Sequence, residues 1–133
     1  STGAAENNTI NKGIVITAGQ NILRASLGSW SHTGTMTSSS DRRLKKYIEP
    51  ITDALSKVQA MNGVNFDYVN DEEVGRFTGL IAQDVQAVFP EAVTEIDDKG
   101  HLGIAYANMV GLLVEAIKEQ QIQIDELKQR RVN

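Results

Sequence analysis

Apolar residues recur at several spacings along this chain, and each spacing predicts a different kind of element. Over residues 106–131 they alternate by fours and threes, which predicts one long helix with a heptad seam. Residues 64–68 alternate apolar and polar side chains, as expected for a half-buried strand. Residues 92–96 and 101–104 flank a turn rich in Asp and Gly, a pattern typical of a β-hairpin.

Shorter elements are expected between these segments. Pro50 suits the first turn of a helix that continues over residues 51–58. Residues 82–89 fit a second short helix, which Pro90 stops, and residues 77–80 are expected to continue a strand. The fold is therefore predicted to be a small α+β domain with a short sheet or hairpin and a long C-terminal helix.

The first forty residues differ from the rest in composition. They are rich in Gly, Ser, Thr and Asn, and residues 14–17 are β-branched, which predicts a strand. Residues 33–40 are small and polar and are expected to form an exposed linker. The chain is thus predicted to divide into an N-terminal β segment with its linker, 1–40, and a domain, 41–133.

The long helix carries an apolar stripe that needs a partner to cover it. We call this stripe the seam; it consists of Tyr106, Val110, Leu113, Ile117, Gln120, Ile124 and Leu127. In the first half of the helix the seam fits equally the domain's own core or a partner helix, whereas beyond Ala116 partner helices are favoured. Gln120 adds a polar layer, which costs stability but can fix register or oligomer state.

Composition and charge exclude several classes of function. The 133 residues are 41% hydrophobic and 23% charged, which is typical of one globular domain with a modest core. The net charge of −4 argues against a nucleic-acid partner. The chain has no cysteine, and its two histidines are not at ligand spacing, so neither a metal nor another cofactor is expected. No apolar run reaches the roughly 18 residues of a membrane span, so no membrane partner is expected.

Three short motifs follow one another along the chain. They are Ser40-Asp41 with Arg43, Leu44, Lys45 and Ile48; residues 79–85 with Phe89-Pro90-Glu91; and Tyr106 with residues 115–119. Together they resemble the C-terminal intramolecular chaperone domain of phage tailspikes, tail fibres and neck appendages, the self-cleaving S74 peptidase family. The resemblance covers residues 40 to about 129.

This resemblance implies a single-turnover serine peptidase within a chaperone. The domain would form a homotrimer through a coiled coil and assist the folding of the fibre, spike or appendage segment that precedes it in the same chain. Residues 1–40 would be the end of that passenger's stem. The family's catalytic dyad falls on Ser40 and Lys45, and cleavage would release the domain in the host cytoplasm during assembly, while the passenger goes to the virion tail or neck.

The residue chemistry is compatible with such a dyad. Serine attacks an amide only when a base takes its proton, and no histidine lies near Ser40 in sequence. A neutral lysine can serve, and desolvation or neighbouring cations favour the neutral form. If a helix began after Ser40, Lys45 would lie one turn on, and free N–H groups would be available to an oxyanion. From spacing alone, however, Ser40 is predicted to be only a helix N-cap.

The position of the cut stays open between two bonds. The family favours Ser40–Asp41, but a serine that attacks its own carbonyl carbon closes a four-membered ring. Attack on the preceding carbonyl would cut Ser39–Ser40, and attack from another subunit permits either bond. Gln83 and Asp84 are candidates to orient the dyad or a subunit contact, or else they simply cap and solvate a short helix.

Two other functions stay open. The chain could be a trimerisation module that never cleaves, or a related domain that releases a membrane-tethered transcription factor. Intact Ser40 and Lys45 favour cleavage over the first alternative. The Gly- and Thr-rich N-terminal segment favours a phage fibre over the second.

Overall fold

Residues 35–69 and 75–132 are described by the structure, a computed structural model. The chain divides into two compact units, 1–45 and 46–133. The predicted strand at residues 14–17 lies outside the described residues. The division of the chain into a passenger stem and a chaperone domain stays a prediction.

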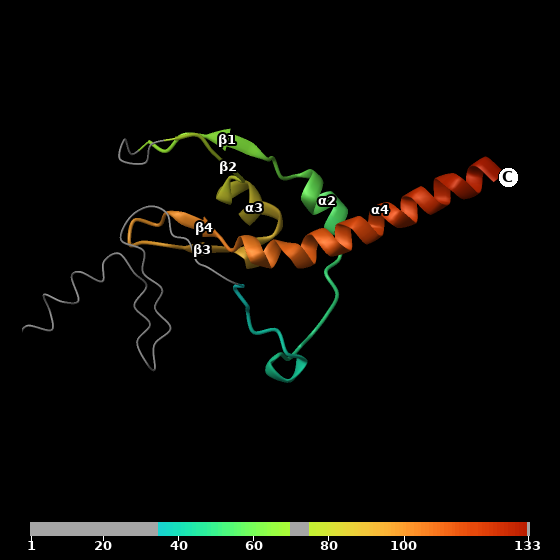
Figure 1. The fold of residues 1–133 in the computed structure, drawn as a ribbon, viewed down its shortest axis with the longest axis horizontal. Helices are drawn as coiled ribbons and strands as arrows, with labels where there is room; N and C mark the ends of the chain where they lie inside the picture. The colour runs from blue at the N-terminus through green and yellow to red at the C-terminus, as the bar shows by residue number, and fades with distance from the viewer. Residues whose placement is uncertain (1–34, 70–74, 133) are drawn as a thin grey trace, which may run out of the picture. The chain divides into compact units, whose positions relative to one another are not determined.

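The strands of the described residues form two small antiparallel sheets of two strands each (Figure 1). β1 (Val64–Phe66) pairs with β2 (Phe77–Gly79). β3 (Val93–Glu95) pairs with β4 (Leu102–Ile104) across the predicted turn. The predicted strands and the predicted hairpin are thus confirmed, with shorter strands than the sequence indicated.

The helices account for most of the remaining described chain. The α-helices are α2 (Ala54–Gln59), α3 (Ala82–Val88) and α4 (Met109–Val132), and single 3₁₀ turns are η2 (Arg42–Leu44), η3 (Pro90–Ala92) and η4 (Tyr106–Asn108). Two of the predicted helices are confirmed: α3 ends at Val88, just before Pro90, and α4 runs to the C-terminal end of the described chain. The prediction of an α+β domain with a long C-terminal helix is therefore confirmed.

The predicted start of the first helix was wrong. α2 begins at Ala54, because Asp53 has a left-handed backbone conformation with φ 54° and ψ 35° and makes no capping bond with its side chain. The acceptor for the N-terminus of α2 comes from α4 instead. Glu119 accepts the Ala54 N–H at 2.9 Å and the Leu55 N–H at 3.0 Å, one with each carboxylate oxygen. These bonds satisfy two donors that a helix start leaves free and place a negative charge at the positive end of the helix dipole.

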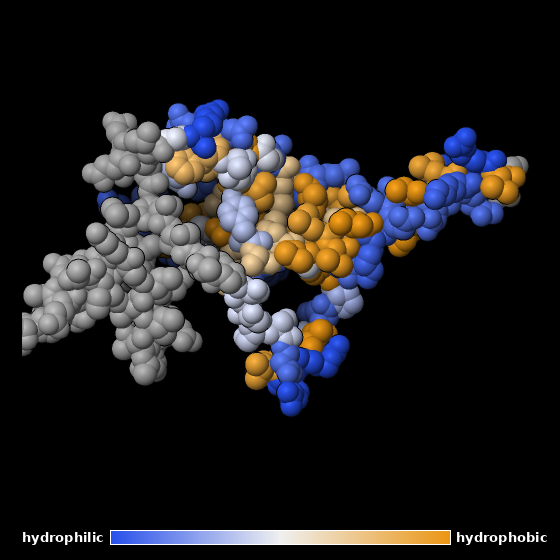
Figure 2. Space-filling model, viewed as in Figure 1, coloured by the Kyte–Doolittle hydropathy of each residue, from blue (hydrophilic) through white to orange (hydrophobic). Residues whose placement is uncertain are grey.

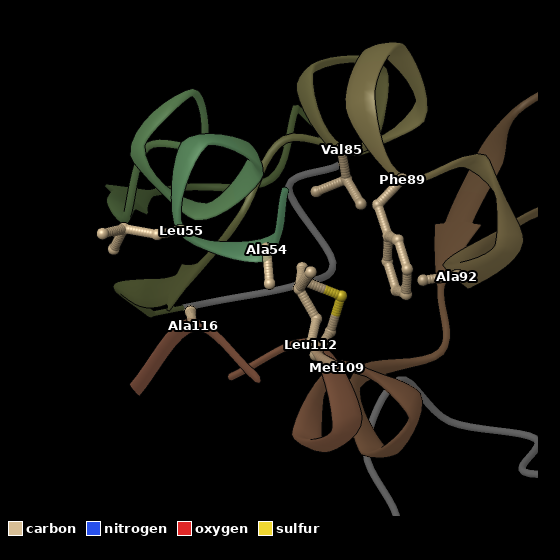
Figure 3. Close-up of a cluster of buried hydrophobic side chains, with 8 residues drawn as sticks. All are labelled: Ala54, Leu55, Val85, Phe89, Ala92, Met109, Leu112 and Ala116. Carbon is tan, nitrogen blue, oxygen red and sulfur yellow. The ribbon is translucent and has the colours of Figure 1, made fainter. Parts of the chain in front are cut away.

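The hydrophobic core joins α2, α3, η3 and α4 (Figure 3). Its buried members are Ala54, Leu55, Val85, Phe89, Ala92, Met109, Leu112 and Ala116. Leu112 and Val85 have no exposed surface, and in Figure 3 the side chains of Met109 and Leu112 extend from α4 toward α2 and α3. The core is aliphatic apart from Phe89, in keeping with the 5% aromatic content of the chain.

α4 buries a different stripe from the seam. Met109, Leu112 and Ala116 face the core, whereas the apolar seam residues Tyr106, Val110, Leu113, Ile117, Ile124 and Leu127 are 44–63% exposed. The first half of the seam is therefore only partly covered by the domain itself, as at Tyr106, and none of its members belongs to the buried core. Figure 2 shows apolar side chains gathered over α2 and the first half of α4.

The second half of α4 extends beyond the body of the domain, as its orange-to-red end in Figure 1 shows. All residues from 120 to 132 are exposed. This half of the helix therefore contributes nothing to the core.

Candidate functional site

The first motif forms a single tight turn. Asp41 is the N-cap of η2, and its Oδ1 accepts the Arg43 N–H at 2.8 Å. Lys45 ends the turn in extended conformation, and its N–H donates to the Arg42 carbonyl at 3.1 Å. A 3₁₀ turn rises only about 2 Å per residue, so this short turn keeps the residues before and after it, including Ser40 and Lys45, close together.

The turn brings together the two residues of the predicted dyad. Lys45 Nζ donates a hydrogen bond to Ser40 Oγ over 2.6 Å. A charged lysine donates along such a contact, and a neutral lysine can accept the hydroxyl proton along the same line. Both side chains are exposed in the single chain, so the described residues do not shield this pair from water.

A second interaction holds the turn between these two residues. Arg43 Nε donates to Asp41 Oδ1 at 3.1 Å, and Arg43 Nη2 donates to Asp41 Oδ2 at 2.9 Å. We call this two-pronged ion pair the Asp41–Arg43 clamp. Its hydrogen bonds lower the pKa of the Asp41 carboxyl and raise the pKa of the Arg43 guanidinium. The pair is exposed to solvent, so its main effect is to order the turn rather than to stabilise the fold.

The helix start differs from the one that the sequence suggested. Asp41, not Ser40, is the N-cap, and it engages the N–H of Arg43. Within residues 35–69 and 75–132, no hydrogen bond is formed by the N–H of Asp41 or of Arg42. These two groups remain as donors at the positive end of the turn, beside the bonds considered for cleavage.

Gln83 and Asp84 lie in the first turn of α3, in the second unit of the chain. Gln83 is exposed and Asp84 is half-buried. The carboxylate of Asp84 has the charge that favours a helix N-terminus. A contribution of this pair to the dyad or to a subunit contact stays a prediction.

The second and third motifs meet at Tyr106. Its hydroxyl oxygen accepts the Leu80 N–H at 2.9 Å and ties the end of β2 to η4. A Cβ atom at Gly79 would lie 2.5 Å from that same oxygen. Position 79 needs a glycine because Tyr106 lies against it, so one contact within the fold accounts for both residues.

Chemistry of other kinds is not indicated by the described part of the chain. Its His, Asp and Glu side chains form no group of three or more that could hold a metal ion. None of its helices combines the length and the apolar character that crossing a bilayer requires. The Ser40–Lys45 pair is therefore the candidate site of this chain.

Comparison with known proteins gives a family match that begins at Ser40. Residues 40–94 match the model of the Peptidase S74 family, described as "Chaperone of endosialidase". Over 97 residues, 68% of this chain, the sequence is 40% identical to the Long tail fiber protein Gp37 of Enterobacteria phage K3 and equally to that of phage T2. The chain spans only 8% and 7% of the length of these relatives. The protein of the same name from phage M1 is 35% identical over 96 residues, 38% of its length.

Proposed function

Because residues 40–94 belong to the Peptidase S74 family, the chaperone of endosialidase, we propose that this chain is the intramolecular chaperone of a phage fibre protein and cuts itself free beside Ser40. The observation that carries the proposal is the 2.6 Å contact between Lys45 Nζ and Ser40 Oγ, at the first residues of the matched segment. Relatives named as long tail fibre proteins support a fibre as the passenger. Residues 1–40 would then be the end of its stem.

Cleavage would begin with neutral Lys45, which removes the proton from Ser40 Oγ. The oxygen attacks a carbonyl carbon, the carbon–nitrogen bond breaks, and the Lys45 ammonium returns its proton to the leaving nitrogen. Water then hydrolyses the resulting ester to a carboxylic acid and restores the serine. If Ser39–Ser40 is cut, the N–H groups of Asp41 and Arg42, which have no acceptor within residues 35–69 and 75–132, are suited to stabilise the oxyanion that forms between these steps. If Ser40–Asp41 is cut, the Asp41 nitrogen is the leaving group, and of these two groups only the Arg42 N–H can serve.

The geometry of attack differs for the two bonds. Ser40 can reach the preceding carbonyl within its own chain and cut Ser39–Ser40. Cleavage of Ser40–Asp41, which the family favours, needs the hydroxyl of a second chain because attack on its own carbonyl closes a four-membered ring. The intact masses of the two products will identify the bond.

The dyad is tested by two alanine variants with matched controls. Ser40→Ala and Lys45→Ala should each leave the full-length chain uncut on a denaturing gel. Ser39→Ala and Lys46→Ala change the neighbouring residues of the same kinds and should still be processed. Normal processing of the Ser40→Ala chain would show that another residue is the nucleophile.

The need for a neutral base predicts the pH dependence of cleavage. The rate should rise with pH on the alkaline side of neutrality, since only the unprotonated amine accepts a proton. A rate that stays flat from about pH 5 to about pH 9 would mean that proton transfer to lysine does not limit the reaction.

The exposed seam of α4 supports assembly through partner helices. Ile117 and Ile124 occupy one seam position and Leu113 and Leu127 the other, a combination that in parallel coils leans toward dimers. We propose a homotrimer all the same, because the fibres of this family are trimeric and a fibre stem would need three chains. The polar side chain of Gln120 would lie between the helices and restrict their register.

The seam is tested by changing its charge. The double variant Ile117→Asp/Ile124→Asp should be monomeric by light scattering, because carboxylates at the seam would have to be buried between helices. Ile122→Asp is the matched control, since Ile122 is 58% exposed on α4 but lies outside the seam. A dimeric wild-type chain would refute the proposed stoichiometry.

Assembly is also proposed to control cleavage. Ser40 and Lys45 are exposed in the single chain, and association of three chains would shield them and fix the linker for attack. The monomeric seam variant should therefore cleave more slowly than wild type at equal concentration. Equal rates would show that assembly does not control the reaction, and a wild-type trimer that never cleaves would identify a trimerisation module instead.

A further inference from the structure

α2 depends on a distant residue for its N-terminal cap. Asp53 precedes the helix with φ 54° and makes no side-chain capping bond. The two oxygens of Glu119 take its place and accept the Ala54 and Leu55 N–H groups at 2.9 and 3.0 Å, in partly buried contacts. A helix of six residues has little stability of its own, so its first turn relies on this carboxylate.

The residues that Glu119 holds belong to the core. Ala54 has no exposed surface, and Leu55 is 8% exposed. Both lie in the same buried cluster as Leu112 of α4. Loss of the cap would therefore loosen one wall of the core and not just a surface turn.

Glu119 lies at the point where α4 leaves the body of the domain. Ala116 is the last buried residue of the helix, and residues 120–132 are all exposed. The seam residues Ile117 and Ile124 lie on either side of Glu119 along the chain. Because an uncovered helix end frays, the helical state of α4 near Glu119 depends on what covers the seam beyond it.

We propose that Glu119 couples the assembly of α4 to the folding of the domain. When helices associate along the seam, α4 is fixed as a helix through Glu119, and the carboxylate caps α2. When they separate, fraying reaches Glu119, the cap opens, and Ala54 and Leu55 leave the core more often. Coupling of this kind is reciprocal, so a folded domain also favours assembly. The link to assembly rests on the proposed function, whereas the cap itself does not.

The coupling is tested by amide hydrogen exchange at Ala54 and Leu55 in the whole chain. Glu119→Ala should speed exchange at both amides about ten- to hundredfold, as expected for the loss of charged acceptors at a helix start. Glu115→Ala is the matched control, because the Glu115 carboxylate pairs with Lys118 at 3.0 Å on the same helix and should leave both amides unchanged. Glu119→Gln keeps one acceptor oxygen, so exchange should rise at only one amide even if the alanine variant fails to fold.

A second pair of variants tests the link to assembly. Ile124→Asp/Leu127→Asp changes two exposed seam residues beyond Glu119. This variant should be monomeric and should exchange at Ala54 and Leu55 about tenfold faster than wild type, since the cap loosens with the helix. When Glu119→Ala is added to this seam variant, exchange at Ala54 and Leu55 should be no faster than with Glu119→Ala alone, because both changes act through the same cap.

The outcomes separate the coupling from the proposed function. A monomeric seam variant with wild-type protection at Ala54 and Leu55 would overturn the coupling and leave the proposed assembly intact. Unchanged protection in both Glu119→Ala and Glu119→Gln would overturn the cap on which the coupling depends. A wild-type chain that is monomeric by light scattering would refute the assembly and the coupling together.

Discussion

Adding one methyl group at Gly79 should displace the Tyr106 ring and cost the domain about 1 kcal/mol of unfolding free energy. A Cβ atom at this position would lie 2.5 Å from the Tyr106 hydroxyl oxygen, 3.4 Å from its Cζ and 3.7 Å from Phe66 Cε1. The first distance is shorter than real Cβ contacts allow, whereas the last is ordinary contact. In Gly79→Ala the tyrosine must therefore move.

The size of the effect follows from how Tyr106 can move. The ring is 52% exposed and the clashing atom is its tip, so it can swing toward solvent without shifting β2. That movement breaks the bond from the Leu80 N–H, worth about 0.5–1.5 kcal/mol, and loses part of the ring's packing. Replacing glycine by alanine returns about 0.4–1 kcal/mol through the unfolded chain. This return roughly cancels the lost hydrogen bond, so the net loss is mainly that of the ring's packing, about 1 kcal/mol, which should lower the melting temperature by roughly 4–8 °C.

Thermal unfolding followed by circular dichroism measures this loss in four chains. They are wild type, Gly79→Ala, Tyr106→Phe and the double variant. Because phenylalanine lacks the clashing oxygen, Gly79→Ala should cost less in the Tyr106→Phe chain than in wild type. Gly63→Ala is the control, since a Cβ there meets no atom within 4 Å. The reasoning is refuted if Gly79→Ala melts at or above wild type, or costs the same in both backgrounds.

Two further changes test the core and the β3–β4 turn. Leu112 is fully buried, so Leu112→Ala should lower the unfolding free energy in urea by about 2–5 kcal/mol, whereas Ile122→Ala removes a side chain that is 58% exposed and lies outside the seam, and it should cost far less. In that turn, the side chain of His101 hydrogen-bonds the Asp97 carboxylate, which also accepts the backbone N–H groups of His101 and Lys99. These bonds lower the pKa of the Asp97 carboxyl. The ionised carboxyl therefore contributes stability above its unfolded pKa of about 3.9, and this is lost as pH falls through the lower folded value. Stability measured from neutral pH downward should fall more in wild type than in Asp97→Asn, and equal slopes would contradict this role.

The elements that the sequence predicts correctly are those with local signals. The β3–β4 hairpin follows from its Asp- and Gly-rich turn, and Pro90 marks the end of α3. The start of α2 was missed because its acceptor, Glu119, lies 65 positions along the chain from Ala54. No window of sequence contains both partners of such a cap.

The buried face of α4 was missed for a different reason. Residues 109–117 are apolar on two neighbouring faces of the helix, and periodicity alone does not say which one meets the core. The structure buries Met109, Leu112 and Ala116 and leaves the heptad seam exposed. In a single chain both faces compete for one core, and only tertiary packing decides between them.

The two residues of the candidate site could be predicted from the sequence, but the turn that brings them together could not. The family resemblance singled out Ser40 and Lys45, and the structure places their side chains 2.6 Å apart. Ser40 and Asp41 are both good N-cap residues, so sequence alone could not decide which of them begins the turn. Arg43 decides in favour of Asp41, because it binds that carboxylate through its backbone and its guanidinium.

Because α4 contacts the rest of the domain only up to Glu119, the part of the helix after Glu119 could be replaced by another helical sequence. The helix has 24 residues and is about 36 Å long, yet its core contacts end at Ala116 and its cap contact ends at Glu119. A heptad sequence of different oligomer preference, joined in helical register after Glu119, would leave the core and the cap of α2 unchanged. Under the proposed assembly, the residues after Glu119 would adjust how many passenger chains are gathered, together with the seam residues that precede Glu119, while the buried residues of α4 and the Glu119 cap keep the body of the domain folded.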